Sequence, residues 1–101
     1  MFSFQSLDVY RCSIEFIALA DRIAAALPRG QAAMGDQLRR ASLSIPLNIA
    51  ESDGRTGLAD ARRHLAIARG STMECAAILD AARAIGLVEP EAYRGGIGRL
   101  S

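Results

Sequence analysis

The chain has 101 residues, a formal net charge of +1 and 50% hydrophobic residues, of which few are aromatic. A chain of this length forms one domain around one core, so we treat residues 1–101 as a single helical domain without separate catalytic and binding domains. The abundance of alanine favours an all-α protein, and no stretch reaches the ~20 apolar residues of a membrane span.

The first expected helix begins near Ser6 or Leu7 and ends before Pro28, because proline disfavours helical geometry in the residue that precedes it. Apolar residues follow the helical repeat in two series rather than one. The first series is Leu7, Tyr10, Ile14 and Ile17, and the second is Val9, Phe16, Ala20, Ile23 and Leu27. This segment therefore has two apolar faces, whereas a helix in a simple bundle needs one.

The second expected helix starts between Ala33 and Asp36, runs to about Ser52 and contains Pro46. A proline inside a helix removes one backbone hydrogen bond, so we predict a kink at Pro46 that shapes a packing surface. At 100° per residue, this helix also has two apolar sectors. One sector holds Leu38, Ala41, Ser42, Ile45 and Ile49, and the other holds Leu43, Pro46, Leu47 and Ala50.

A narrow polar stripe on the same helix consists of Gln37, Arg40, Ser44, Asn48 and Glu51. Serine and asparagine are poor formers of exposed helix surface, so the first interpretation is a hydrogen-bond network between helices. A solvent-facing strip and a ligand site are the alternatives. In a network, Arg40 needs a carboxylate, and Glu74 or Glu15 is the expected partner.

The third expected helix, from Leu58 to Ile85, is the longest and contains Gly70. A glycine inside a helix costs about 1 kcal/mol relative to alanine, so we expect a neighbouring helix to approach closely at Gly70. Gly86 is the expected C-cap. Pro90 is the expected first residue of a short fourth helix, which holds three glycines and would fray in isolation.

All twelve basic residues are arginines, and residues 29–69 carry seven of them against four acids. The functional interpretation is a basic surface that binds the phosphates of nucleic acid. The residues predicted for this surface are Arg39, Arg55, Arg62, Arg63 and Arg69. The alternative is a solvated face with local ion pairs, because acidic residues lie nearby and no aromatic residues are interleaved to stack bases.

Few residues carry the chemistry of a catalytic or metal site. Cys12 and Cys75 are isolated, expected to be buried reduced thiols, and His64 is the only histidine, so we expect no metal and no cofactor. Asp60 and His64 have the spacing of a helical pair, but no nucleophile with an oxyanion-hole motif is recognisable. We predict a non-enzymatic protein with a packed or hydrogen-bonded His64. The N-terminus lacks a secretory signal, so a cytoplasmic location is expected.

Three segments resemble a known family. The segments FQSLDVYRCSIEF (residues 4–16), DQLRRASLSIPLNIAES (36–52) and HLAIARGSTMECAAILDAARAIGL (64–87) are similar to small four-helix-bundle proteins encoded in intervening sequences of bacterial 23S rRNA genes. The resemblance covers about residues 4–88. The motif positions correspond to Gln37, Arg39, Arg40, Ser44, Ile45, Pro46, Asn48, Ile49, Ala50, Glu51, Arg55, Ala68, Arg69, Gly70, Ser71 and Glu74. Departures from the pattern are Ser52, His64 and a fourth helix interrupted by Gly95, Gly96 and Gly98.

The resemblance implies an antiparallel up-and-down bundle that assembles into pentameric rings, as in this family and in the related accessory proteins of diversity-generating retroelements. Those accessory proteins bind a reverse transcriptase and nucleic acid through a basic surface. Together with the doubled apolar faces, the resemblance predicts a homo-oligomeric, pentameric scaffold or adaptor. The alternative is an RNA- or DNA-binding accessory protein with an arginine-lined ring. We expect no membrane partner and no small-molecule substrate.

Overall fold

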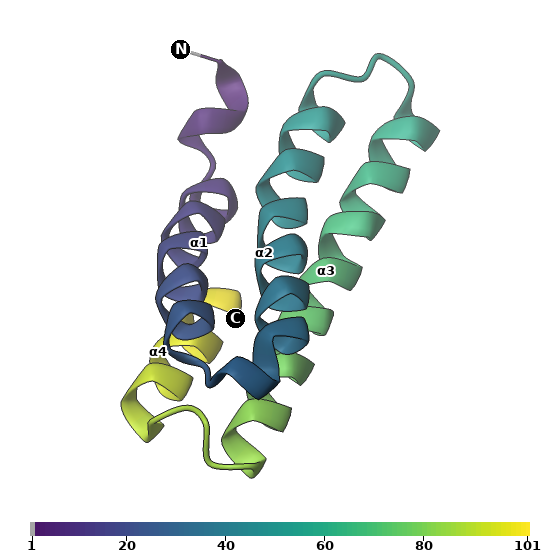
Figure 1. Cartoon of the computed structure of the whole chain (residues 1–101). Coiled ribbons are helices and arrows are strands. Elements are labelled where there is room, and N and C mark those ends of the chain that lie inside the picture. The colour runs from purple at the N-terminus through teal and green to yellow at the C-terminus, as the bar shows by residue number, and fades with distance from the viewer. Residues whose placement is uncertain (1) are drawn as a thin grey trace.

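The computed structural model describes residues 2–101 as four α-helices in an elongated bundle of 44 × 21 × 18 Å. The helices are α1 (Asp8–Ala26), α2 (Ala32–Asp53), α3 (Leu58–Ala84) and α4 (Pro90–Leu100), with short 3-10 helices η1 (Ser3–Ser6) and η2 (Arg29–Gln31). In Figure 1 the chain runs down α1, up α2, down α3 and up α4. The described residues contain no strand, so the predicted all-α class with four helices is confirmed.

The helix ends follow from local backbone chemistry. Leu27 is extended, with φ −68° and ψ 145°, as expected for a residue that precedes a proline. Gly86 has a φ of 76°, a conformation that glycine adopts without strain. The Leu87 N–H donates to the Ala82 carbonyl at 2.9 Å and the Gly86 N–H donates to the Arg83 carbonyl at 3.1 Å. These two bonds form a Schellman motif that ends α3, as predicted for Gly86.

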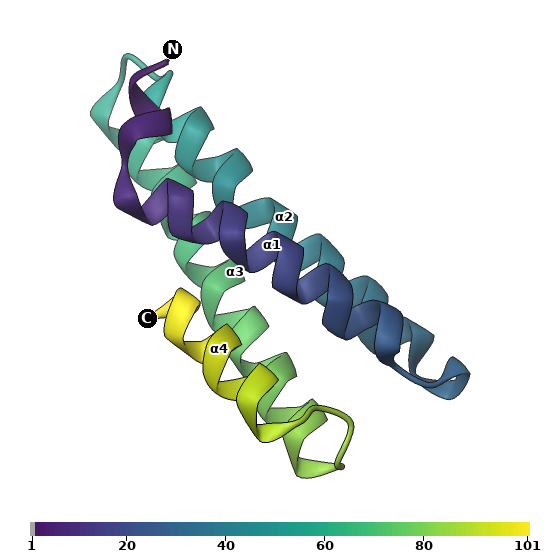
Figure 2. The same cartoon turned by 90° about the vertical axis from the view of Figure 1, so that its left-hand side faces the viewer.

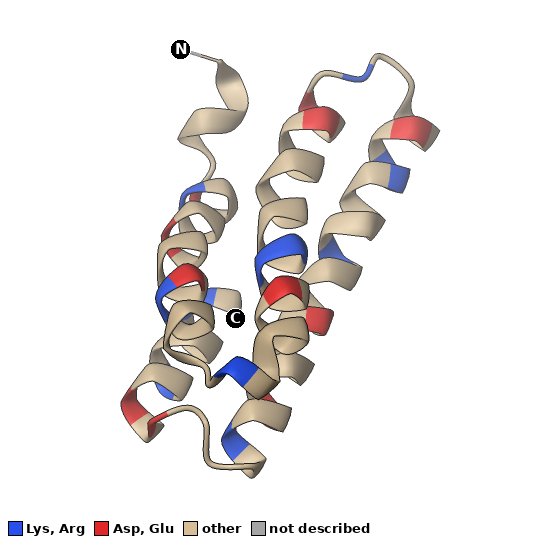
Figure 3. Cartoon of the chain, viewed as in Figure 1, with Lys and Arg blue, Asp and Glu red and all other residues tan. Residues whose placement is uncertain are grey.

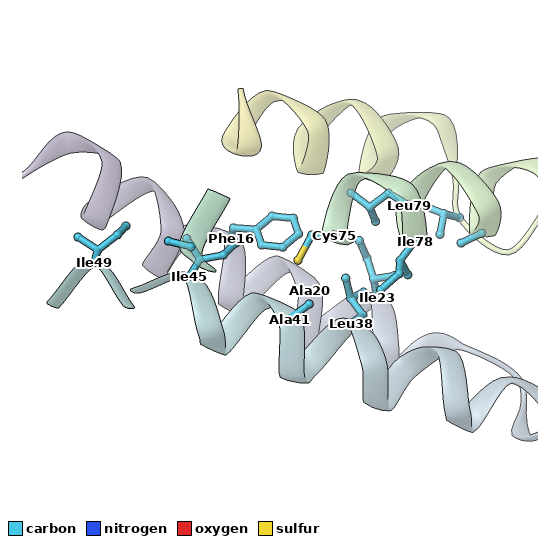
Figure 4. Close-up of a cluster of buried hydrophobic side chains, with 13 residues drawn as sticks. Phe16, Ala20, Ile23, Leu38, Ala41, Ile45, Ile49, Cys75, Ile78 and Leu79 are labelled. Atoms are coloured by element: carbon cyan, nitrogen blue, oxygen red, sulfur yellow. The ribbon is translucent and has the colours of Figure 1, made fainter. Parts of the chain in front are cut away.

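The core lies along the middle of the bundle, where α2 packs on α1 and α3, and α4 packs on the same two helices. Figure 4 shows the buried side chains that α1, α2 and α3 direct toward one another. The largest fully buried side chains are Phe16, Leu38, Cys75 and Leu79. The remaining core is mostly alanine and isoleucine, which allows close helix packing.

The short α4 covers only part of the bundle. In Figure 2 it lies beside the half of α3 that ends at Ala84, and the other half of α3, which begins at Leu58, extends past it. The Tyr93 hydroxyl on α4 donates to Asp80 on α3 at 2.6 Å, and this bond raises the pKa of Tyr93. Packing therefore stabilises a glycine-rich segment that would fray in isolation.

Close helix approaches occur at two glycines other than the predicted one. A Cβ at Gly70 would have no atom within 4 Å, so the predicted close approach at Gly70 is wrong within the chain. Gly70 is exposed on α3. By contrast, a Cβ at Gly96 would lie 2.7 Å from the Cδ1 of Leu79, and one at Gly35 would lie 3.4 Å from the Cβ of Ala24. These two glycines allow α4 to contact α3 and α2 to contact α1.

Pro46 is buried inside α2, which continues without interruption to Asp53. Its missing N–H leaves the Ser42 carbonyl without its usual helical donor. The Ser42 hydroxyl does not bond this Ser42 carbonyl. It donates instead to the Arg39 carbonyl, one turn earlier, at 3.0 Å. The kink at Pro46 stays a prediction.

Candidate interaction surfaces

The polar stripe of α2 supplies one side of a hydrogen-bond network with α3. The Asn48 Nδ2 donates to the Ser44 carbonyl at 2.9 Å and to the Ser44 Oγ at 3.1 Å. The Ser71 Oγ on α3 donates to the same Ser44 Oγ at 2.8 Å. Both serines and Asn48 are partly or fully buried. The expected network between helices is therefore present around Ser44 and Asn48, and Ser71 is its partner on α3.

His64 joins the network from α3 and is 8% exposed. Its Nδ1 lies 2.9 Å from the Asn48 Oδ1, and its Nε2 lies 3.1 Å from an Arg63 guanidinium nitrogen. The Asn48 Nδ2 points at Ser44, so the Asn48 Oδ1 faces His64 and accepts a hydrogen bond from the His64 Nδ1. The His64 Nε2 therefore accepts from the Arg63 guanidinium. Both imidazole nitrogens are engaged, as expected for a hydrogen-bonded histidine. All buried side-chain polar atoms of the described residues have a hydrogen-bond partner.

The two ends of the stripe do not belong to this network. Gln37, Arg40 and Glu51 are exposed. Among residues 2–101, Arg40 forms no ion pair with Glu74 or Glu15, so the predicted partner for Arg40 is wrong. Among the described residues, only the middle of the stripe, Ser44 and Asn48, is hydrogen-bonded to side chains of α3.

Gln37 and Glu74 both line a shallow groove between α2 and α3. Glu15 instead lies 3.7 Å from the Arg99 guanidinium on α4. Glu51 pairs with Arg55, which lies four residues later, just beyond the end of α2. The exposed ends of the stripe therefore act as ordinary surface contacts.

The five predicted nucleic-acid-binding arginines divide into two groups. Arg39 lies 3.0 Å from Asp21, and Arg55 and Arg63 both pair with Asp60, at 3.4 and 3.1 Å. These three arginines match the alternative of local ion pairs. In the described part of the chain, the remaining two, Arg62 and Arg69, form no ion pair. Figure 3 shows acidic and basic positions interspersed along α1, α2 and α3.

A second group consists of exposed apolar side chains from the first two expected helices, and we call this group the outer apolar face. Its four exposed members are Leu7 (42% exposed), Ile14 (43%), Leu43 (50%) and Leu47 (54%). Ile17 and Leu43 line the same groove between the two helices. The face corresponds to the first apolar series of α1 and the second apolar sector of α2. The surplus apolar surface predicted from the sequence is therefore exposed in the single chain, although Pro46 within that sector is buried.

The two cysteines differ in environment. Cys75 is fully buried, and burial, followed by the neighbouring Glu74 carboxylate, raises the pKa of its thiol to about 12. Cys12 is exposed, so the prediction of two buried thiols is wrong for Cys12. Within residues 2–101, no group of three His, Cys, Asp or Glu side chains is placed to hold a metal ion. None of the described helices is both long and apolar enough to cross a membrane.

These features define an all-α four-helix protein with a hydrogen-bond network between α2 and α3 and an outer apolar face. The family model for the 23S rRNA-intervening sequence protein matches residues 5–100, so the chain belongs to this family. Among curated proteins, no sequence matches this chain.

Proposed function

We propose that this protein is a non-enzymatic, homo-oligomeric scaffold whose copies assemble through the outer apolar face. The observation that carries the proposal is the exposure of the apolar side chains of Leu7, Ile14, Leu43 and Leu47. Burying a leucine or isoleucine side chain contributes about 1.5 to 3 kcal/mol, so four half-exposed side chains per copy favour association. The family resemblance favours five copies, and the location proposed for them is the cytoplasm.

The polar network supports the non-enzymatic part of the proposal. A general base needs a free nitrogen within reach of a nucleophile. Both ring nitrogens of His64 are engaged by Asn48 and Arg63, and the Ser44 and Ser71 hydroxyls are bonded to each other. We assign these side chains to holding α2 and α3 together.

Native mass spectrometry and light scattering of the whole chain test the assembly. A pentamer has a mass of about 54 kDa, five times the 10.7 kDa chain. The double variant Leu43→Gln and Leu47→Gln should reduce the mass of the assembly, because it replaces the centre of the face with polar groups. Met73→Gln, at an exposed apolar position on α3, is the matched control and should leave the mass unchanged. A wild-type protein that remains a monomer at high concentration would refute the proposal.

A second candidate function is nucleic-acid binding, which is favoured by Arg62 and Arg69 on α3, because neither forms an ion pair within residues 2–101. The three ion-paired arginines make it the weaker candidate, because phosphates would have to displace their carboxylates. Binding to an RNA or DNA oligonucleotide should be strongest at ~50 mM salt and should fall steeply as salt rises. No binding at that salt concentration would eliminate this function.

A further inference from the structure

We propose that the shallow groove between α2 and α3 receives the Arg40 side chain of a second copy of this chain, whose guanidinium pairs with Glu74. This contact depends on the proposed scaffold function, since it joins copies that the outer apolar face brings together. It adds a charged pair that determines which surface of the neighbouring copy is met.

The groove combines an apolar lining with two polar groups. Its polar groups are Gln37 of α2 and Glu74 of α3, and Ala77, Ile78 and Ala81 form most of its α3 side. The volume of the groove is about 340 Å³, which is enough for one long side chain. Within residues 2–101, α4 contacts α1 and α3 but not α2, so α4 does not cover this groove.

Glu74 decides what can fill the groove. It is exposed, and it forms no ion pair within residues 2–101. An apolar side chain over the groove would take water from this carboxylate without replacing its hydrogen bonds, which is costly. An arginine avoids this cost, because its aliphatic stem can lie on the alanines while its guanidinium bonds the carboxylate. The groove therefore favours a long cationic side chain.

Arg40 supplies such a side chain beside the outer apolar face. Arg40, Leu43 and Leu47 are spaced by three and four residues, so they lie on one side of α2. All three are exposed, and Arg40 forms no ion pair in the described part of the chain. A neighbouring copy that covers the two leucines therefore also meets Arg40.

Arg40 and Glu74 lie at the same height in the bundle. The Ser71 hydroxyl donates to Ser44, so these two residues are level, and the chain runs up α2 and down α3 (Figure 1). About one turn below them, Arg40 on α2 and Glu74 on α3 are level again. In a ring whose axis runs along the bundles, copies are related by rotation without a shift along that axis. Arg40 of one copy therefore arrives at the height of Glu74 in the next.

Charge reversal tests the pairing, with the mass of the whole chain followed by native mass spectrometry and light scattering at low salt. Arg40→Glu and Glu74→Arg each place like charges where copies join. Each should raise the concentration needed for half assembly at least about tenfold. Both substitutions in one chain restore opposite charges and should return assembly to the wild-type concentration. Arg94→Glu makes the same change of charge at an exposed arginine on α4 and should leave assembly unchanged.

A mixture separates a contact between copies from a contact within one chain. Arg40→Glu chains and Glu74→Arg chains, mixed in equal amounts, bring opposite charges together only where unlike copies join. The mixture should therefore assemble at a concentration at which neither variant assembles alone. A pair within one chain would stay mismatched in both variants, so it predicts no gain on mixing.

Circular dichroism of each variant verifies that the bundle remains folded. Glu74→Gln, which is close to glutamate in shape, is a second variant for the groove and should weaken assembly severalfold without introducing a repulsive charge.

The pairing and the scaffold function can fail separately. A wild-type protein that remains a monomer would refute the scaffold function and the pairing with it. An oligomeric wild type that neither single reversal weakens would refute the pairing alone. The same holds for a combined variant that stays as weak as the single variants, and for a mixture that shows no gain.

Discussion

Alanine replacements at Gly96 and Gly70 should differ in their effects on stability, although both glycines lie in helices. In α3, a Cβ at Gly70 meets no atom within 4 Å. The only effect of Gly70→Ala is then the higher helix propensity of alanine, which adds about 1 kcal/mol to the unfolding free energy. In α4, the same added carbon at Gly96 lies 2.7 Å from the Cδ1 of Leu79.

The contact at Gly96 is costly because Leu79 cannot move away freely. Leu79 is completely buried, and the added carbon would also lie 3.6 Å from the ring of Phe16. Overpacking of this kind costs about 1 to 3 kcal/mol, which offsets or exceeds the gain in propensity. The unfolding free energies of the two variants should therefore differ by about 1 to 3 kcal/mol, with Gly70→Ala the more stable.

Urea denaturation followed by circular dichroism at fixed protein concentration measures this difference. A fixed concentration is needed because association adds to the stability of an oligomer. Equal stabilisation by both substitutions would show that α4 can shift away from Leu79 at no cost, and would contradict the close packing. A loss of stability in Gly70→Ala would show that a neighbouring chain approaches α3 at that position.

The remaining predictions concern the hydrogen-bond network between α2 and α3, the buried thiol of Cys75 and one surface ion pair. Asn48→Ala should lower the unfolding free energy by about 1 to 3 kcal/mol in urea denaturation, because it leaves a buried imidazole nitrogen without its acceptor. Cys75 should react with a thiol reagent only on unfolding, whereas Cys12 should react in the folded protein. Because the pKa of Cys75 is raised from 9.0 to about 12, the unfolded chain loses this proton first as pH rises. Stability from this thiol is thus complete below pH 9 and declines above it, by at most about 1.4 kcal/mol per pH unit, and Cys75→Ala should remove that decline. Arg39→Ala should change stability by less than about 1 kcal/mol, because its ion pair with Asp21 is exposed.

The sequence predicts the helices well because their ends depend on nearby residues. Pro28 and Gly86 act within one or two positions, so the ends of α1 and α3 were accessible from local rules. The doubled apolar pattern also predicts that one apolar face of a helix stays exposed, because a single chain can bury only one of the two, but it does not say which. In α2 the exposed face is the one that holds Leu43 and Leu47.

The partners across helices are less predictable. Helical periodicity places Asn48 on a polar stripe, but the identity of its partner depends on the rotation and height of α3. The stripe suggested a carboxylate for Arg40, whereas the actual partners of its central residues are His64 and Ser71. The close approach at Gly96 depends on the path of α4, which the loop after Gly86 sets. Periodicity along a single helix predicts neither the partner of Asn48 on α3 nor the close approach of α4 at Gly96.

The hydrogen-bond network between α2 and α3 also suggests how this protein could be redesigned. Directional bonds from Asn48, Ser44 and Ser71 set the height of one helix against the other, so the leucines outside are not needed to define the fold. Changing those leucines to glutamate or lysine should yield a soluble single-chain scaffold with the same backbone, onto which new binding surfaces can be engineered.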